Sequence, residues 1–234
     1  MSVSPKCLSL KQFWGSEGLI GNQMTELEIA LNSKLSRSEK KEMFYKDTLR
    51  FLMANRSKEG VKNMIVLILG LAGSGKTTIC RLLQKDFKVI TIYTTRKRRI
   101  DDGTNYIFIN EKDFSSLYKQ NEILTKARIG NDLYGLKNEL AECKINIAVS
   151  DIFTLRQLRR KKIKCVAMYL DVPIEECERR LVLRGDDSMQ ISKKLALGKK
   201  WCEKEKNQCS YTIMSGSVDE EYKQVLCILH RLYD

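Results

Sequence analysis

The stretch Met64–Ile79 reads M-I-V-L-I-L-G-L-A-G-S-G-K-T-T-I. Its first part is continuously apolar, which predicts a buried strand of a parallel sheet. The pattern G-x-x-x-x-G-K-[ST] begins at Gly70 and ends at Lys76 and Thr77. Backbone N–H groups of such a loop surround phosphate oxygens, and the partial positive charge of the following helix N-terminus attracts the same anion. We therefore expect a strand, a phosphate-binding turn and a helix in succession.

Each residue type in this pattern has a chemical reason. The glycines allow the backbone to approach the phosphates, the lysine reaches the terminal phosphates, and the hydroxyl that follows binds Mg²⁺. A flexible glycine turn without a ligand is the alternative interpretation. The pattern predicts that nucleotide phosphates and Mg²⁺ bind here, with Thr77 as the metal ligand. The predicted nucleotide-binding residues are Gly70, Gly73, Ser74, Gly75, Lys76, Thr77 and Thr78.

Composition bounds the class of protein. The chain has 234 residues, of which 43% are hydrophobic and 30% charged, so it can hold one sizeable α/β core with an appendage. No apolar run reaches the length of a membrane span, and the N-terminus lacks the apolar block of a signal peptide. We expect a cytoplasmic protein with no membrane partner.

Cysteine and histidine usage excludes several chemistries. The eight cysteines form no C-x-x-C pair, which favours reduced thiols and argues against zinc. His230 is the only histidine, in a C-terminal helical pattern. A histidine triad or general base is therefore excluded unless His230 supplies it.

The net charge of +13 indicates an anionic partner without naming it. Basic residues that bind a small polyanion and those that bind nucleic acid look alike at this level. Nucleic-acid binding is a hypothesis that rests on this charge alone, and we do not expect it. The basic run at 159–162 is interpreted as the solvated face of a helix.

The chain divides into an N-terminal extension, 1–62, and a nucleotide-binding domain, 63–234. We expect poor order before Thr25. Thr25 and Ser36 each begin a capping-box pattern ahead of helical spacing, so two amphipathic helices should follow. Their apolar faces must pack on the core domain, on each other or on a partner.

Strands and helices alternate after the phosphate loop, which indicates a parallel sheet with right-handed crossovers. Asp151 follows one buried strand, where an aspartate that orders Mg²⁺ would sit in a P-loop fold; a solvated residue at a strand end is the alternative. The expected strands are 88–91, 106–109, 145–149 and 166–170, and the expected helices are 78–85, 111–120, 155–162 and one that starts at Pro173.

Four blocks resemble guanylate kinase. The segment T-T-R-K-R-R at 94–99, with Gly103 and Tyr-x-Phe from Tyr106, resembles the segment of that family that binds the monophosphate. The segment 123–135 resembles the block that ends G-N-x-Y-G, and R-L-V-L-R-G at 180–185 resembles the start of the mobile lid. With the phosphate loop these blocks stand in the family's order. The resemblance implies an α/β fold of P-loop NTPase type, with a parallel sheet flanked by helices, a small nucleotide-monophosphate-binding insertion and a helical lid.

The resemblance also implies a nucleoside monophosphate kinase in which the phosphate loop binds ATP, with Lys76 and the loop amides on its β- and γ-phosphates and Thr77 on Mg²⁺. Phosphoryl transfer needs positioned cations around spreading negative charge and requires no histidine base. Lys194 stands where the family has a lid arginine. The implied catalytic residues are Lys76, Arg96, Arg180 and Arg184, and the implied acceptor-binding residues are Arg96, Arg99, Tyr106, Thr125, Tyr134 and Asp151.

The sequence departs from the family where the base is read. Thr125 stands where the family has an acidic residue that reads the guanine N–H edge, and Thr lacks its paired acceptor oxygens. Ile92 and Leu136 stand at the places of two serines, whereas Asp151 aligns with an aspartate near the base. Losing these groups should alter or relax the choice of base, although GMP or dGMP remains the first expected acceptor.

The segment after the first arginines also differs. Arg98 replaces a proline, and the stretch 99–103 is two residues shorter than the family pattern, so its acidic residue is either Asp101 or Asp102. The competing hypothesis is a non-catalytic interaction module, because guanylate-kinase-like domains also act as protein-binding scaffolds. Such modules typically lose the phosphate loop, which is intact here. A P-loop kinase for another phosphorylated acceptor is a further alternative.

Overall fold

The computed structural model describes residues 63–99, 102–140 and 145–233. The helices expected after Thr25 and Ser36 lie outside the described residues, so the division between an N-terminal extension and a nucleotide domain stays a prediction. Within the described ranges, no helix is both long enough and apolar enough to cross a membrane.

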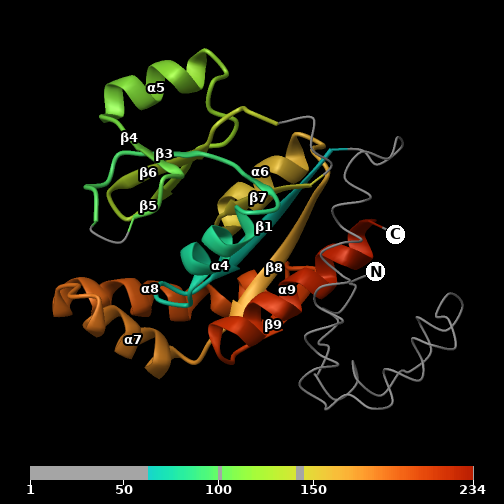
Figure 1. The fold of residues 1–234 in the computed structure, drawn as a ribbon. Helices are drawn as coiled ribbons and strands as arrows, with labels where there is room; N and C mark the ends of the chain where they lie inside the picture. The colour runs from blue at the N-terminus through green and yellow to red at the C-terminus, as the bar shows by residue number, and fades with distance from the viewer. Residues whose placement is uncertain (1–62, 100–101, 141–144, 234) are drawn as a thin grey trace, which may run out of the picture.

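The described core is a five-stranded parallel sheet. Its strands are β1 (Met64–Gly70), β2 (Lys88–Val89), β7 (Ile145–Val149), β8 (Cys165–Asp171) and β9 (Tyr211–Met214). They lie in the order β2-β7-β1-β8-β9, which places the predicted apolar strand at the centre (Figure 1). Every residue from Met64 to Leu69 is at most 2% exposed, because both faces of this strand are covered.

Different helices cover the two faces of the sheet. They are α4 (Lys76–Leu83), α6 (Ile152–Arg160) and α9 (Val218–Tyr233). Alternate residues of β1 point to opposite faces, so Val66 and Ile68 pack with α4 and α9, while Ile65 and Leu67 pack with α6. The parallel strands all end at one edge, which is the edge where α4 and α6 begin.

A smaller sheet with its own helix forms the predicted insertion. Its elements are β3 (Ile92–Thr94), β4 (Tyr106–Phe108), α5 (Glu111–Lys119), β5 (Ala127–Ile129) and β6 (Asp132–Leu136). The strand order is β4-β3-β6-β5, and a separate small core of Phe114, Ile123 and Leu133 joins α5 to the sheet. The lobe stands above the carboxyl end of β1 in Figure 1.

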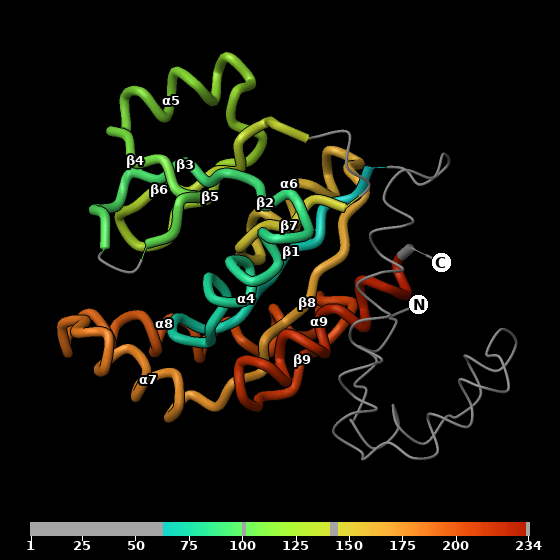
Figure 2. The backbone as a smooth tube through the Cα atoms, in the orientation of Figure 1, coloured from blue at the N-terminus to red at the C-terminus, as the bar shows by residue number. Residues whose placement is uncertain are grey.

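Two helices form the predicted lid, α7 (Ile174–Leu183) and α8 (Ser188–Lys206). They project together on the side of β1 opposite the small sheet (Figure 2). The helix α8 passes directly over the phosphate loop, because a Cβ on Gly198 would lie only 2.6 Å from Leu71 Cδ2. The fold thus places an insertion and a lid on either side of one sheet edge.

Several predicted boundaries were wrong. The segment 88–91 belongs to β2 for two residues only, after which the chain enters β3 of the other sheet. The helix predicted to start at residue 155 begins at Ile152, because the Asp151 side chain caps it. The helix predicted at 78–85 is Lys76–Leu83, which starts inside the phosphate loop.

Candidate functional site

The phosphate loop has the backbone geometry that its glycines predict. Gly75 caps α4 with φ +93°, a left-handed conformation that favours glycine. Gly73 has φ +82°, and a Cβ there would lie 2.5 Å from the backbone oxygen of Cys177. Ser74 is fully buried, so the loop presents backbone and not this hydroxyl. The loop therefore surrounds a space at the N-terminus of α4.

Lys76 lies at the centre of this loop. Its Nζ donates hydrogen bonds to the carbonyl oxygens of Gly70, at 2.9 Å, and Leu71, at 2.6 Å. Burial lowers the pKa of Lys76 to about 8, although Cys177 and Glu205 raise it in part. The ammonium group is thus held by backbone dipoles in a poorly solvated place, where an anion would stabilise its charge strongly.

Arg96 is the most buried cation of the small-sheet side. It is 7% exposed and makes two hydrogen bonds to the Asp102 carboxylate, with Arg96 Nη1 2.7 Å from Asp102 Oδ2. The guanidinium carbon lies 5.0 Å and 5.2 Å from the ring centroids of Tyr106 and Phe108. The rings hold the guanidinium plane in place. The sequence allowed two positions for the acidic residue of this segment, and among the described residues Asp102 is the one that pairs with Arg96.

Asp102 organises the loop around these cations. Its Oδ2 also accepts a hydrogen bond of 2.7 Å from the backbone N–H of Arg99. Burial alone would raise the pKa of the Asp102 carboxyl, but the hydrogen bonds from Arg96 and Arg99 hold that pKa below its usual value. The carboxylate remains ionised, so the Arg96 charge is partly compensated within the protein.

Two tyrosines connect the small sheet to the phosphate loop. Burial raises the pKa of Tyr106 to about 12, and the neighbouring Arg96 and the Thr77 side chain oppose this rise. Burial likewise raises the pKa of Tyr134, and the neighbouring Arg96 opposes the rise. Both phenols stay protonated near neutral pH and act as hydrogen-bond donors. Thr77, the predicted metal ligand, and Tyr106, a predicted acceptor residue, line the same cleft.

The lid cations are held by acidic residues of the lid itself. Arg180 Nε lies 2.7 Å from Glu176 Oε1, and Arg180 Nη1 lies 3.5 Å from the backbone oxygen of Ser74. Asp186 accepts hydrogen bonds from Arg184, at 2.7 and 2.6 Å, and from Lys194 Nζ, at 2.9 Å. The pKa of Asp186 is far below its usual value, chiefly because Arg184 donates to the carboxylate.

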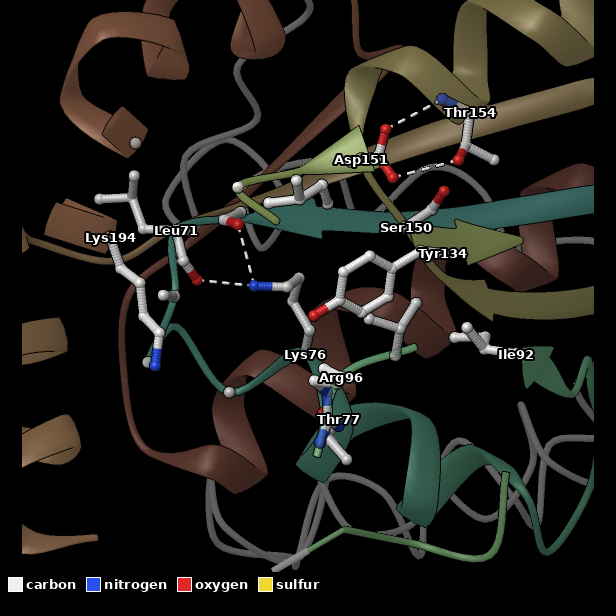
Figure 3. A pocket seen from close by; sticks show the side chains of 18 of the residues that line it. Leu71, Lys76, Thr77, Ile92, Arg96, Tyr134, Ser150, Asp151, Thr154 and Lys194 are labelled. Atoms are coloured by element: carbon white, nitrogen blue, oxygen red, sulfur yellow. Dashed lines mark hydrogen bonds between the residues drawn. The ribbon is translucent and has the colours of Figure 1, made fainter. Parts of the chain in front are cut away.

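The phosphate loop, Arg96 with the two tyrosines, and the lid cations line one cleft of about 740 Å³ (Figure 3). Ser74 and Thr125 are not among its lining residues. Glu205, Phe153 and Trp201 do line it and were missed by the sequence reasoning, because nothing in the local pattern links them to the loop. The predicted residues that line the cleft are Gly70, Gly73, Gly75, Lys76, Thr77, Thr78, Arg96, Arg99, Tyr106, Tyr134, Asp151, Arg180, Arg184 and Lys194.

The residues predicted near the base have other partners. Thr125 is fully buried, and its Oγ1 accepts a hydrogen bond of 3.2 Å from Leu136 N. The structure therefore places Thr125 in the core of the small sheet and outside the cleft lining. Asp151 lines the cleft, but its Oδ1 accepts from Phe153 N, at 2.7 Å, and from Thr154 N, at 3.0 Å. Its observed role is that of a helix cap.

The parallel sheet, the phosphate loop at its edge and the second cluster of cations and phenols define a P-loop kinase of the nucleoside monophosphate type. The chain belongs to the guanylate kinase family, since the sequence pattern of the family described as Guanylate kinase matches residues 62–232.

Similar proteins and one solved structure support this family assignment. A guanylate kinase of Wolbachia pipientis wMel is 28% identical over 73% of this chain and 90% of its own length. A guanylate kinase of Blochmanniella floridana is 30% identical over 55% of this chain and 67% of its own length. The crystal structure of guanylate kinase from Anaplasma phagocytophilum has the same fold, with a TM-score of 0.57 at 18% identity over 74% of this chain and 87% of its own.

Proposed function

We propose that the chain transfers the γ-phosphoryl group of ATP to a nucleoside monophosphate, with Mg²⁺ required and GMP or dGMP as the first acceptors to test. In this reaction the bond between the γ-phosphorus and the β,γ-bridging oxygen breaks. A new bond forms between that phosphorus and a phosphate oxygen of the monophosphate, so the products are ADP and a nucleoside diphosphate. The curated relatives named guanylate kinase support this acceptor class.

The observation that carries the proposal is the arrangement of two cationic groups around one cleft. Lys76 and the loop amides stand on one side, and Arg96 with Tyr106 and Tyr134 on the other. Two phosphate-binding sites that face each other suit in-line transfer, because catalysis of this reaction is mostly positioning and charge stabilisation. Arg180 and Arg184 on the lid would stabilise the negative charge of the transferring group.

The residues present fit a magnesium ion carried by the nucleotide. The described residues contain no group of three or more His, Cys, Asp or Glu side chains placed to hold a metal. Mg²⁺ commonly binds through one or two protein groups, with phosphates and water completing its shell. Thr77 at the start of α4 would supply the protein oxygen. When bound, the ion would neutralise charge on the phosphates.

A reducing compartment such as the cytoplasm is part of this proposal. The cysteines of the described residues are free thiols, among them Cys80 and Cys177 beside the phosphate loop. Burial raises the pKa of Cys80 to about 12 and of Cys177 to about 11, so neither is a reactive thiolate near neutral pH.

A panel of nucleoside monophosphates, assayed by coupled detection of ADP with ATP and Mg²⁺, tests the proposed function. We expect turnover with GMP and dGMP that is abolished by a chelator of Mg²⁺. Folded protein that binds ATP but turns over none of the monophosphates would contradict the proposal.

A further inference from the structure

In Figure 3 Ile92 and Ser150 lie on the side of the cleft away from Lys194 and the phosphate loop. A nucleoside monophosphate has one charged end, and its phosphate belongs with Arg96 and the tyrosines. Its nucleoside must then occupy the region where the cleft is lined by Ile92, Leu136, Val149 and Phe153. Ile92 is 5% and Leu136 is 2% exposed, so the wall there is apolar and well packed. Such a wall contacts the flat faces of a base and reads none of its polar edge.

Aromatic rings extend this wall to the lid helix. Phe153 at the start of α6 and Trp201 of α8 pack edge to face, with ring centroids 6.1 Å apart and planes at 66°. Phe153 is 39% exposed and both residues line the cleft. Stacking on aromatic rings is tolerant of base identity, because every base has a π-face. The shape of this region favours a flat ring system without selecting its substituents.

The Asp151 carboxylate at the start of α6 has little acceptor capacity left. Asp151 Oδ1 accepts two backbone N–H groups, and its Oδ2 accepts from Thr154 Oγ1 at 3.1 Å. Thr125 Oγ1 is used by Leu136 N inside the small sheet. The guanine edge presents the donors N1–H and N2–H₂ side by side, and binding both requires two coplanar hydrogen-bond acceptors. Neither side chain offers that pair.

Ser150 is the exception among these polar groups. Its Oγ is buried and has no hydrogen-bond partner among the described residues, yet Ser150 lines the cleft. The backbone N–H of Ser150 is bonded to the oxygen of Ile68 at 3.0 Å, which fixes the residue at the end of β7. In Figure 3 its side chain lies between Asp151 and the Tyr134 ring, on the opposite side of the view from Lys194. A buried hydroxyl without a partner at such a place is costly unless a ligand satisfies it.

We propose that the Ser150 hydroxyl makes the polar contact to the base of the acceptor, and that the site accepts purine monophosphates with little discrimination among GMP, IMP and AMP. This inference rests on the proposed function. A hydroxyl rotates, so it donates to the O6 of guanine or hypoxanthine and accepts from the N6 amino group of adenine. Because the hydroxyl satisfies either edge and the Asp151 carboxylate is used by the N-terminus of α6, the substituent at position 2 of the ring is not read.

The first experiment measures kcat/KM for GMP, IMP and AMP with the full chain at saturating ATP and Mg²⁺. We expect the three values to lie within about tenfold of each other, whereas a site with matched acceptors discriminates by about 10⁴ or more. A preference for GMP of more than tenfold over either of the others would overturn the inference. Absence of turnover with all three would instead count against the proposed function, so the two failures are distinguishable.

The second experiment tests the residue with Ser150→Ala and the matched variant Ser116→Ala, whose hydroxyl lies on α5 outside the cleft. We expect Ser150→Ala to raise the acceptor KM by roughly 2- to 10-fold for all three monophosphates, which corresponds to one hydrogen bond. The KM for ATP, kcat and Tm should not fall, because the serine has no partner within the described protein. Ser116→Ala should change none of these values.

Two results would remove Ser150 from this role. One is an unchanged acceptor KM in Ser150→Ala. The other is an effect seen with GMP but not with dGMP, since the hydroxyl would then contact the ribose 2′-OH and not the base.

Discussion

The two sides of the cleft differ in how they bind. The phosphate-loop side consists of backbone amides, one lysine and the glycines Gly73 and Gly75, whose left-handed conformations leave little freedom for other residues. On the opposite side, Arg96 is held by Asp102 and two aromatic rings. Beyond it the wall becomes apolar at Ile92 and Leu136. If the proposed function holds, this chain combines a strictly built site for phosphate with a loosely specified site for the base.

The largest expected effect is on the phosphate-loop side. Replacing Lys76 with alanine should lower kcat by about 10³-fold, because a positioned cation at the transferring group is lost. The free energy of unfolding should change little, since a buried ammonium group whose pKa is about 8 is removed together with its desolvation cost. Coupled ADP detection and thermal unfolding measure the two quantities.

Lys85→Ala is the matched control for Lys76→Ala, because Lys85 is exposed and does not line the cleft. A Lys76→Ala variant with the turnover and ATP affinity of the parent would contradict the proposal that the phosphate loop binds ATP. It would favour an interaction module that has no use for the phosphate loop.

The second prediction addresses the phosphate end of the acceptor side. Arg96→Ala should lower kcat/KM for the monophosphate by about 10²-fold and leave the KM for ATP unchanged. It should also destabilise the protein by about 3 to 5 kcal/mol, since Asp102 would be left as a buried charge without its guanidinium partner. Denaturant unfolding measures the stability change.

The double variant Arg96→Ala with Asp102→Ala separates the two effects of Arg96. It should recover most of the stability, because no unpaired charge remains, while kcat/KM stays low. Recovery of activity together with stability would show that Arg96 acts only on the fold and not on the acceptor phosphate.

Much of the phosphate-binding side was predictable from the sequence. The continuous apolar run of β1 indicated a buried central strand, and the spacing from Gly70 to Thr77 indicated the turn that follows. Both depend on residues that are neighbours in the chain. The strand 145–149 was predicted correctly for the same reason, because a central parallel strand is apolar on both faces.

The base end was not predictable in the same way. The burial of Thr125 depends on how β6 and the segment before β5 pack, and the contact of Phe153 with Trp201 joins α6 to α8. Such partners are set by tertiary packing and leave no local signal. The pairing of Arg96 with Asp102 likewise follows from the loop conformation, which puts the Arg99 amide on the same carboxylate.

The third prediction concerns Glu205, which lies where the two sides meet. Burial raises the pKa of Glu205 to about 7, with Asp151 adding to the rise and Lys76 and Arg156 opposing it. The unfolded carboxyl titrates near 4.5, so between pH 4.5 and 7 the folded state holds the proton more tightly. Raising the pH through that window should therefore lower the free energy of unfolding, by about 1 to 2 kcal/mol.

Glu205→Gln removes this dependence. The variant should have a higher Tm than the parent above pH 7, and the difference should vanish near pH 4.5. The neighbouring exposed carboxylate offers a matched variant, Glu203→Gln, which should follow the parent at every pH. A constant difference in Tm between Glu205→Gln and the parent across pH 4.5 to 8 would show that ionisation of this carboxyl does not set the stability.

The smallest expected effect distinguishes a helix cap from a base-reading group at Asp151. Asp151→Ala should lower the free energy of unfolding by about 1 kcal/mol, because the first N–H groups of α6 lose their acceptor. Asp151→Ser keeps a capping oxygen and should regain most of that stability. Serine removes the carboxylate, however, so the ratio of kcat/KM for GMP to that for IMP is the sharper measurement. An unchanged ratio in Asp151→Ser means that the carboxylate serves α6 alone. A ratio that falls in this variant would mean that the Asp151 carboxylate contacts the guanine edge. The base end of the cleft would then select its ligand through a specific polar contact, as the phosphate loop does, in spite of its apolar wall.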